Sequence, residues 1–406
     1  MKPLDGIRVL DASHVVSGPV CCWFLAALGA EVIRVEPPGG DHTWRTKPVF
    51  APDGEHRGAP GRRDVATSPL RRGRGKKSVV LNLKHEEGRA LFKRLAAQCD
   101  VLVQNAVPGA MERLGLDYAS LAPEMPRLVY CTITGYGHDG PYRDRPSMDL
   151  VVQAMSGLMA KTGFPDGPPT KVGATVGDQV PALFAALGIL AALRQRDVDG
   201  QGQLGDVAML DSLLALLWDE PIDDFAAQGL PERVGNGDPR GAPLDVFATA
   251  DGWAALVLTQ DAQWKALCET MGRPELASRW PDFAARLANR DAVNAAVAEW
   301  CRGLGTDVVV ERLLAHGIPA GPVRSPYDAP GDPQVLHRGA LERLRHPDRD
   351  EPTEAWGPVF PARLSRSEGE TPPAEPLGAS TDAVLRDLLA VDEETLARLR
   401  GDGVLG

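Results

Sequence analysis

The fold is decided by Ile7-Arg-Val-Leu-Asp-Ala12 and Glu31-Val-Ile-Arg-Val-Glu36, two short apolar segments rich in β-branched residues that favour strands. Between them, Ser17-Gly-Pro19 predicts the start of a helix. The apolar run that follows extends to Leu28 and is closed by Gly29, the residue type that commonly follows a helix. A strand, a helix and a second strand within about thirty residues predict a right-handed βαβ unit on a parallel sheet.

The same alternation continues along the chain. Further strands are predicted at 78–83, 100–105, 127–134 and 204–208, with a helix at 86–98 between the first two. This order predicts an α/β fold with a Rossmann-like sheet, whose ligand site lies at the carboxyl ends of the strands. The turn after the first strand lacks the G-x-G-x-x-G pattern, which argues against nicotinamide binding.

Two domains are expected, because 406 residues exceed what one core usually organises. The composition shifts near residue 221, and a β-hairpin turning at Asp251-Gly252 follows. We therefore expect a large Rossmann-like domain over 1–220 and a smaller α+β domain over 221–330. Residues 331–406 are expected to return to the large domain, so that both chain ends build it.

Composition excludes several classes of protein. The hydrophobic fraction of 43% and the charged fraction of 24% are typical of a soluble globular chain. A net charge of -11 argues against nucleic-acid partners. The first residues lack the apolar core of a signal peptide, and we expect no membrane span. The six cysteines form no C-x-x-C pair, which indicates reduced thiols in a cytoplasmic protein and no metal site.

One carboxylate stands out by its position. The segment Val172-Gly-Ala-Thr-Val-Gly-Asp-Gln-Val180 places Asp178 just before the apolar run Pro181 to Leu193, which predicts a buried helix too short to cross a bilayer. Asp178 could cap that helix, or it could act as a nucleophile kept ionised by free N–H groups. Gly173 and Gly177 would let a substrate approach closely. The local sequence leaves both roles open.

The segment Arg71-Arg-Gly-Arg-Gly-Lys-Lys77 places five cations within seven residues of an acidic protein. It could be a solvated loop or a clamp for phosphate groups, which glycine-spaced Arg and Lys suit well. Nucleic acid is a weaker alternative, because no aromatic residues are interleaved for base stacking.

Six segments in order along the chain carry a resemblance to a known family: Leu4-Asp-Gly-Ile-Arg-Val-Leu-Asp11, Leu28-Gly-Ala-Glu-Val-Ile-Arg-Val-Glu-Pro37, Gly75-Lys-Lys-Ser-Val79, Gln104-Asn-Ala-Val-Pro-Gly-Ala-Met-Glu-Arg-Leu-Gly115, Thr134-Gly-Tyr-Gly-His-Asp-Gly-Pro-Tyr142 and Ile318-Pro-Ala-Gly-Pro-Val323. This set resembles the family III CoA-transferases, the group that includes formyl-CoA transferase and carnitine-CoA transferase. The match continues to about residue 404.

The resemblance implies an interlaced homodimer and an aspartate that becomes acylated, which falls on Asp178. It implies transfer of coenzyme A from an acyl-CoA to a free carboxylic acid, through an aspartyl anhydride and an aspartyl-CoA thioester. A carboxylate suits this relay because it leaves as easily as the acceptor carboxylate does, whereas a serine would form a stable ester.

The resemblance also implies which residues bind coenzyme A: Val15, Val16, Pro37, Lys76, Lys77, Asn105, Ala106, Arg113 and Tyr136. Lys77 and Arg113 would bind phosphate, although Arg113 could instead form a surface salt bridge. Pro37, Val16 and Ala106 replace an arginine, a glutamine and an aromatic residue of formyl-CoA transferase. These departures argue against formate and oxalate as substrates.

Two alternatives remain at this point. The same superfamily contains α-methylacyl-CoA racemases, which need a histidine base where this chain has Met148; a thioether cannot take up a proton, and His138 would be a poorly placed substitute. The other alternative is a CoA-binding protein without catalysis. The sequence does not identify the acyl donor or the acceptor acid.

Overall fold

The main sheet of the computed structural model has six parallel strands. Their order is β6 (Lys76–Val80), β2 (Glu31–Glu36), β1 (Arg8–Asp11), β7 (Val101–Gln104), β8 (Val129–Thr134) and β9 (Leu204–Ala208). In chain order this is 3-2-1-4-5-6, the arrangement of a doubly wound Rossmann sheet. The predicted parallel α/β sheet is confirmed. The structure describes every residue except Met1, Pro60, Arg62 and Glu368.

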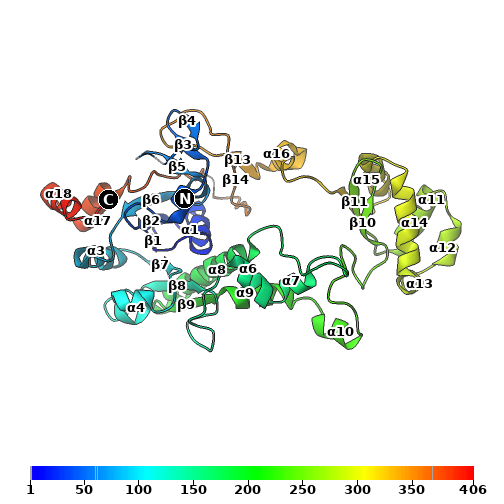
Figure 1. Cartoon of the computed structure of the whole chain (residues 1–406), viewed down its shortest axis with the longest axis horizontal. Helices are drawn as coiled ribbons and strands as arrows, with labels where there is room; N and C mark the ends of the chain where they lie inside the picture. The colour runs from blue at the N-terminus through cyan, green and yellow to red at the C-terminus, as the bar shows by residue number, and fades with distance from the viewer. Residues whose placement is uncertain (1, 60, 62, 368) are drawn as a thin grey trace. The chain divides into compact units, whose positions relative to one another are not determined.

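Helices cover both faces of this sheet, and its central strands β1, β2, β7 and β8 are therefore buried almost throughout, whereas the edge strand β9 is only partly buried. On one face α3 (Glu86–Ala96), α17 (Thr381–Leu389) and α18 (Glu393–Gly401) pack over the strands in one apolar core. On the other face α1 (Ser17–Ala27) and α8 (Val176–Asp199) pack together. Figure 1 shows the C-terminal helices, in red, beside β6 and α3. The C-terminal segment therefore packs on the sheet whose strands come from residues 8–208.

The chain divides into two compact units. The first contains residues 1–156, 173–217 and 334–406, so both chain ends contribute to it. The second contains residues 157–172 and 218–333. The segment 157–172 thus belongs with the second unit, although the sequence-based boundaries had included it in the large domain.

The second unit is built on an antiparallel sheet with the order β10 (Leu244–Ala248), β11 (Trp253–Val257) and β12 (Ala320–Pro322). Ala248 pairs with Trp253, which confirms the hairpin predicted at Asp251-Gly252. Helices α11 (Asp261–Thr270), α14 (Arg290–Arg302) and α15 (Thr306–Leu314) contribute to its apolar core, around the fully buried Trp264.

Helix α8 differs from its prediction in two ways. It runs from Val176 to Asp199, beyond both ends of the expected Pro181–Leu193. It is also buried on one face only, because Leu183, Phe184 and Leu187 are exposed. Among the described residues it is the one helix whose length and mean hydropathy of 1.7 would suffice to cross a membrane. Its Ala182, Ala185 and Ile189 are buried in the first unit, and the role of a core helix accounts for its composition.

Two further segments belong to the first unit. The stretch between β2 and β6 contains a small sheet, β4 (Gly54–His56), β3 (Val49–Ala51) and β5 (Val65–Ala66), followed by α2 (Thr67–Arg72). Helices α17 and α18 are separate elements, because Ala390 between them adopts a left-handed conformation with φ of 52°.

The remaining elements are short. They are η1 (His42–Arg45), α4 (Ala110–Leu114), α5 (Tyr118–Leu121), α6 (Asp149–Met155), α7 (Leu158–Lys161), α9 (Met209–Leu217), α10 (Ile222–Ala227), α12 (Glu275–Arg279), α13 (Phe283–Ala288), η2 (Ala329–Gly331), α16 (Pro333–Arg338), β13 (Leu341–Arg343) and β14 (Trp356–Pro358).

Candidate active site

The site lies where the strand order of the main sheet reverses, between β1 and β7. The chain leaves these neighbouring strands in opposite directions, and ligands of doubly wound sheets bind in the crevice that results. Asn105, directly after β7, joins the two sides: its Oδ1 accepts from the N–H of His14 at 2.7 Å, and its Nδ2 donates to the carbonyl of His14 at 2.8 Å. This amide fixes the turn that follows β1.

That turn holds one residue in an unusual conformation. Val15 has φ of 66°, which a β-branched residue rarely adopts. Its N–H donates to Asp41 Oδ2 at 3.2 Å, and its carbonyl accepts from Arg72 Nη1 at 2.8 Å. Backbone strain of this kind persists only where the surroundings hold it, and it concentrates at functional sites.

A cleft of about 550 Å³ opens beside this turn. Its lining comes from the segments that follow β1, β7 and β8, from the loop before α6 and from the first turn of α8: Val15, Val16, Ser17, Asn105, Ala106, Val107, Pro108, Ile133, Thr134, Gly135, Arg143, Asp144, Arg145, Pro146, Ser147, Met148, Asp178 and Met209. The structure therefore brings Asp178 together with four of the residues suggested for CoA binding, namely Val15, Val16, Asn105 and Ala106.

Asp178 lies in the first turn of α8, two residues after the helix begins at Val176, so its interpretation as the N-cap is wrong. The acceptor for this helix start is Asp149 of α6, whose Oδ1 receives the N–H of Gly177 at 2.8 Å. Gln153 donates to both oxygens of Asp149 at 3.0 Å and holds them in place. A Cβ on Gly177 would lie 2.8 Å from Val152 Cγ2 and 2.9 Å from Asp149 Oδ1, so the close approach that glycine permits here is to α6.

The electrostatic surroundings of Asp178 differ from the sequence-based expectation of nearby donors. No hydrogen-bond donor reaches its carboxylate among the described residues, and the side chain is only partly exposed. Burial and then the charge of Asp149 raise the pKa of Asp178 to about 6, while the charge of Arg72 lowers it. An anion that lacks partners is less stable and more basic than an ordinary aspartate, which favours its use as a nucleophile or base.

A second, more apolar cleft of about 470 Å³ lies at the carboxyl ends of β1, β2 and β6. Pro37, Ala106, Met111 and Leu114 contribute apolar surface to it, and His14 lies at its side. Ala106 lines both clefts, so the two are neighbours along the same edge of the sheet.

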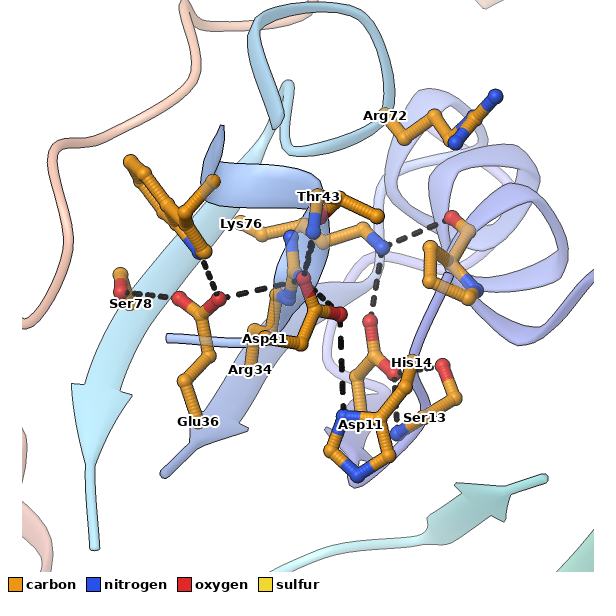
Figure 2. A network of polar contacts seen from close by, with 12 residues as sticks. Asp11, Ser13, His14, Arg34, Glu36, Asp41, Thr43, Arg72, Lys76 and Ser78 are labelled. Carbon is orange, nitrogen blue, oxygen red and sulfur yellow. Dashed lines mark hydrogen bonds and ion pairs between the residues drawn. The ribbon is translucent and has the colours of Figure 1, made fainter. Parts of the chain in front are cut away.

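Lys76 and Lys77 lie elsewhere. The ammonium of Lys76 is buried and donates to Asp11 Oδ2 at 2.7 Å and to the carbonyl of Pro19 at 2.8 Å, as Figure 2 shows. Burial alone would raise the pKa of Asp11, but the charges of Lys76 and Arg34 outweigh it and lower the pKa. Lys77 pairs with Glu31 at 2.7 Å, at the amino ends of the strands. Neither lysine lines either of the two clefts described above, and the buried Lys76 links β6 to β1 through Asp11.

Arg113 and Tyr136 also lie outside the linings of the two clefts. Arg113 is exposed on α4, and the hydroxyl of Tyr136 donates to the sulfur of Met155 at 3.1 Å. The cations that do line the clefts are Arg143, Arg145 and Lys84, which sequence reasoning missed. The pair Arg143 and Arg145 directly after the Gly-Pro-Tyr motif was the available signal.

The basic segment is dispersed rather than gathered into one clamp. Arg71 is exposed, and its Nε donates to the carbonyl of Trp356 at 3.1 Å. Arg74 is buried and bonded to Glu342 and to the carbonyl of Pro358. Arg72 is the member of this segment that reaches the first cleft, through Val15.

The residues named for racemase chemistry do not supply a second base. Met148 lines the cleft with Asp178, but it has no group that accepts a proton at neutral pH. His138 is not part of the cleft lining, and its Nδ1 lies 4.0 Å from Glu112 Oε1.

A carboxylate beside the switch point of a doubly wound sheet is typical of an α/β enzyme acting on a nucleotide-containing substrate. Comparison with known proteins narrows that class. The model of "CoA-transferase family III" matches residues 4–381, and the chain belongs to this family.

Curated relatives and solved structures agree with that assignment. The chain is 38% identical to succinyl-CoA:mesaconate CoA-transferase of Haloarcula marismortui, over 92% of this chain and 93% of the relative. It is 36% identical to succinyl-CoA–D-citramalate CoA-transferase of Chloroflexus aurantiacus, over 100% of this chain and 98% of the relative. It is also 36% identical to formyl-CoA:oxalate CoA-transferase of Streptomyces avermitilis, over 100% of both chains. A crystal structure of a CAIB/BAIF family protein from Brucella suis has a TM-score of 0.82 and 34% identity, covering 95% of this chain and 99% of that one.

We predict that Asp178→Asn stabilises the substrate-free protein. Because the pKa of Asp178 is raised to about 6 by folding, ionisation of this group costs stability. The cost is absent below the ordinary pKa of 3.8 and develops as pH rises through 6. At pH 7.5 the variant should melt roughly 2–3 °C higher, the shift that about 2 kcal/mol produces in a chain of this length, since the entropy of unfolding is about 2.1 cal/mol/K per residue.

Differential scanning calorimetry from pH 4 to pH 8 measures this effect. The gain should vanish toward pH 4. The control is Asp144→Asn, which removes an exposed carboxylate from the same cleft and should leave the melting temperature within about 1 °C. A variant at position 178 that melts no higher than wild type at pH 7.5 contradicts the account.

Proposed function

We propose that this protein transfers coenzyme A from an acyl-CoA thioester to a free carboxylic acid, with Asp178 as the covalent carrier. The observation that carries the proposal is the position of Asp178: a half-buried carboxylate that no donor reaches within the described part of the chain, in a cleft at the switch point of the Rossmann sheet. Membership of CoA-transferase family III supports the reaction class.

The first half of the proposed reaction loads Asp178. Its carboxylate oxygen attacks the thioester carbonyl of the donor, the C–S bond breaks, and CoA leaves as a thiolate while an aspartyl–acyl anhydride forms. The thiolate then attacks the aspartyl carbonyl and expels the donor acid as a carboxylate, which leaves an aspartyl-CoA thioester. Each step exchanges one activated acyl group for another, so one difficult transfer becomes several easier ones.

The second half repeats these steps in reverse order. The acceptor carboxylate attacks the aspartyl-CoA thioester, giving a new anhydride and CoA thiolate. The thiolate attacks the acceptor carbonyl, which forms the new acyl-CoA and restores the Asp178 carboxylate. Of the two oxygens on the restored carboxylate, one comes from the acceptor acid.

The two neighbouring clefts suit the two ends of coenzyme A. We propose that the apolar cleft beside Pro37, Ala106 and Met111 receives the adenine, which requires flat apolar contact. Ala106, shared by both clefts, would lie along the path of the pantetheine arm to Asp178. Lys84, Arg143 and Arg145 are the cations available to the phosphate groups, together with Arg113 at the exposed rim.

The proposed donor is succinyl-CoA, because two of the relatives reported above are named for it. The acceptor acid is to be identified by testing a panel of carboxylic acids. Mesaconate and citramalate are the first choices on the same ground.

We predict that Asp178→Ala and Asp178→Asn abolish CoA exchange, with a loss of at least about a thousand-fold, as expected for removal of a nucleophile. Exchange between succinyl-CoA and each acid of the panel, followed by chromatography of the acyl-CoA products, measures it. Binding of free CoA by calorimetry should change little, because position 178 lies at the acyl end. Exchange that persists in both variants sinks the proposal.

The wild-type enzyme should also lose kcat/KM as pH falls below about 6, since only the ionised carboxylate attacks.

We also infer that the chain functions as a homodimer. Helices α6 and α8, which contact each other within the first unit, expose five apolar side chains to solvent: Leu150, Val151, Leu183, Phe184 and Leu187. Exposed apolar surface of this kind marks an association site, and the family resemblance implies a second copy of the chain as its partner. Sedimentation should give twice the chain mass, and Leu187→Glu should shift the protein toward monomer; a wild-type monomer at micromolar concentration contradicts the inference.

A further inference from the structure

Arg72, the last residue of α2, has an incompletely used guanidinium. Its Nη1 donates to the carbonyl of Val15 at 2.8 Å, which brings the group to the turn that lines the Asp178 cleft. Among the described residues it has no other hydrogen-bond acceptor, and no carboxylate lies within 4.0 Å of it. Figure 2 shows Arg72 apart from the buried network, with no dashed line to any residue drawn there.

The acidic groups near Arg72 are almost all engaged by other partners. Asp41 accepts from Thr43 and from the N–H of Val15, and it lies 3.6 Å from Arg34. The buried carboxylate nearby, Asp11, is bonded to Lys76. Asp178 is the acidic group without such a partner, and its charge acts on Arg72.

Arg72 and Asp178 are therefore two incompletely satisfied charges of opposite sign: Asp178 lines the cleft, and Arg72 contacts the lining through the carbonyl of Val15. Each charge acts on the other, yet they form no ion pair among the described residues. Burial lowers the pKa of Arg72, but an arginine remains a cation throughout the physiological range. The N–H groups of Arg72 that do not bond Val15 are available to a ligand.

We propose that Arg72 binds the second carboxylate of a dicarboxylic acid whose first carboxyl group reacts at Asp178. This rests on the proposed function. The free side of a guanidinium presents two parallel N–H donors that match a carboxylate. With C–C bonds of about 1.5 Å, the three or four bonds between the two carboxyl carbons of a four- or five-carbon diacid span roughly 4–5 Å.

The electrostatics require such a cation. Succinyl-CoA that approaches the ionised Asp178 brings the free carboxylate of its acyl group into a partly buried cleft beside Asp149, and like charges at short range repel. Arg72 offsets this repulsion for the remote carboxylate only. A monocarboxylic acid of the same length has no group that uses it.

The test compares two matched substrates that differ in that one carboxylate. Succinyl-CoA with isotope-labelled succinate and butyryl-CoA with isotope-labelled butyrate share a four-carbon chain and a symmetric exchange. We expect wild type to favour the succinate pair in kcat/KM. Arg72→Met should slow succinate exchange about 10- to 100-fold, the effect of losing a hydrogen bond to a charged group, and leave butyrate exchange within about 3-fold.

Two further variants sharpen the comparison. Arg72→Lys keeps the charge but lacks the two-pronged geometry, so it should recover succinate exchange only in part. Arg71→Gln removes the neighbouring exposed cation, whose Nε contacts Trp356, and should change neither exchange. Melting curves and the affinity for free CoA show that each variant is folded and binds coenzyme A; if Arg72→Met unfolds, Arg72→Lys alone must lower the succinate-to-butyrate ratio.

Several outcomes overturn the proposal. If Arg72→Met slows succinate and butyrate exchange equally, Arg72 acts on Asp178 itself or on coenzyme A and not on the second carboxylate. No loss in either, or a wild type that favours butyrate, removes it as a specificity residue. Asp178→Ala distinguishes failure of the Arg72 proposal from failure of the proposed function. The proposed function fails if wild type exchanges neither pair of substrates, or if Asp178→Ala still catalyses exchange. In either case the Arg72 proposal fails with it.

Discussion

The hydrogen bond from the N–H of Gly177 to Asp149 is the contact on which the site depends. A helix start usually takes its acceptor from its own N-cap residue, but here the acceptor comes from another helix. Thr175, the N-cap residue of α8, makes no side-chain capping bond, and Asp178 in the first turn lines the cleft. Asp149 has a second effect, because its charge lies close enough to raise the pKa of Asp178. One carboxylate thus both positions the other and makes it more basic.

The charges around the site divide into those that hold the fold and those that remain available. Asp11 with Lys76, and Glu36 with Arg34, Ser78 and Trp44, are paired within the sheet and its flanking turn (Figure 2). A buried pair of this sort is costly to break, by about 3–5 kcal/mol, since one partner is left alone in the interior. Asp178 and Arg72 remain without ion-pair partners among the described residues. The charged residues that hold the fold are therefore paired with one another, whereas Asp178 and Arg72 beside the cleft are not.

The sequence predicted the architecture well where the information was local. The apolar segments at 7–12 and 31–36 and the punctuation between them sufficed for the βαβ unit, and Asp178 stood out by its place before a long apolar run. What it could not predict were contacts between segments distant in the chain. Asp149 is 29 positions before Asp178 and carries no local sign of capping another helix. Lys76 and Lys77 look alike in sequence, yet strand alternation sends one side chain into the interior and the other to the surface.

The most direct test of covalent transfer through Asp178 follows an oxygen atom. The enzyme is incubated with unlabelled succinyl-CoA and an acceptor acid whose carboxyl oxygens are heavy isotopes, and the peptide containing Asp178 is then weighed by mass spectrometry. The account predicts that the Asp178 carboxylate gains heavy oxygen from the acceptor, only when both substrates are present. Turnover that leaves this peptide unlabelled would contradict it, because direct transfer between the two substrates never passes an acceptor oxygen to the protein.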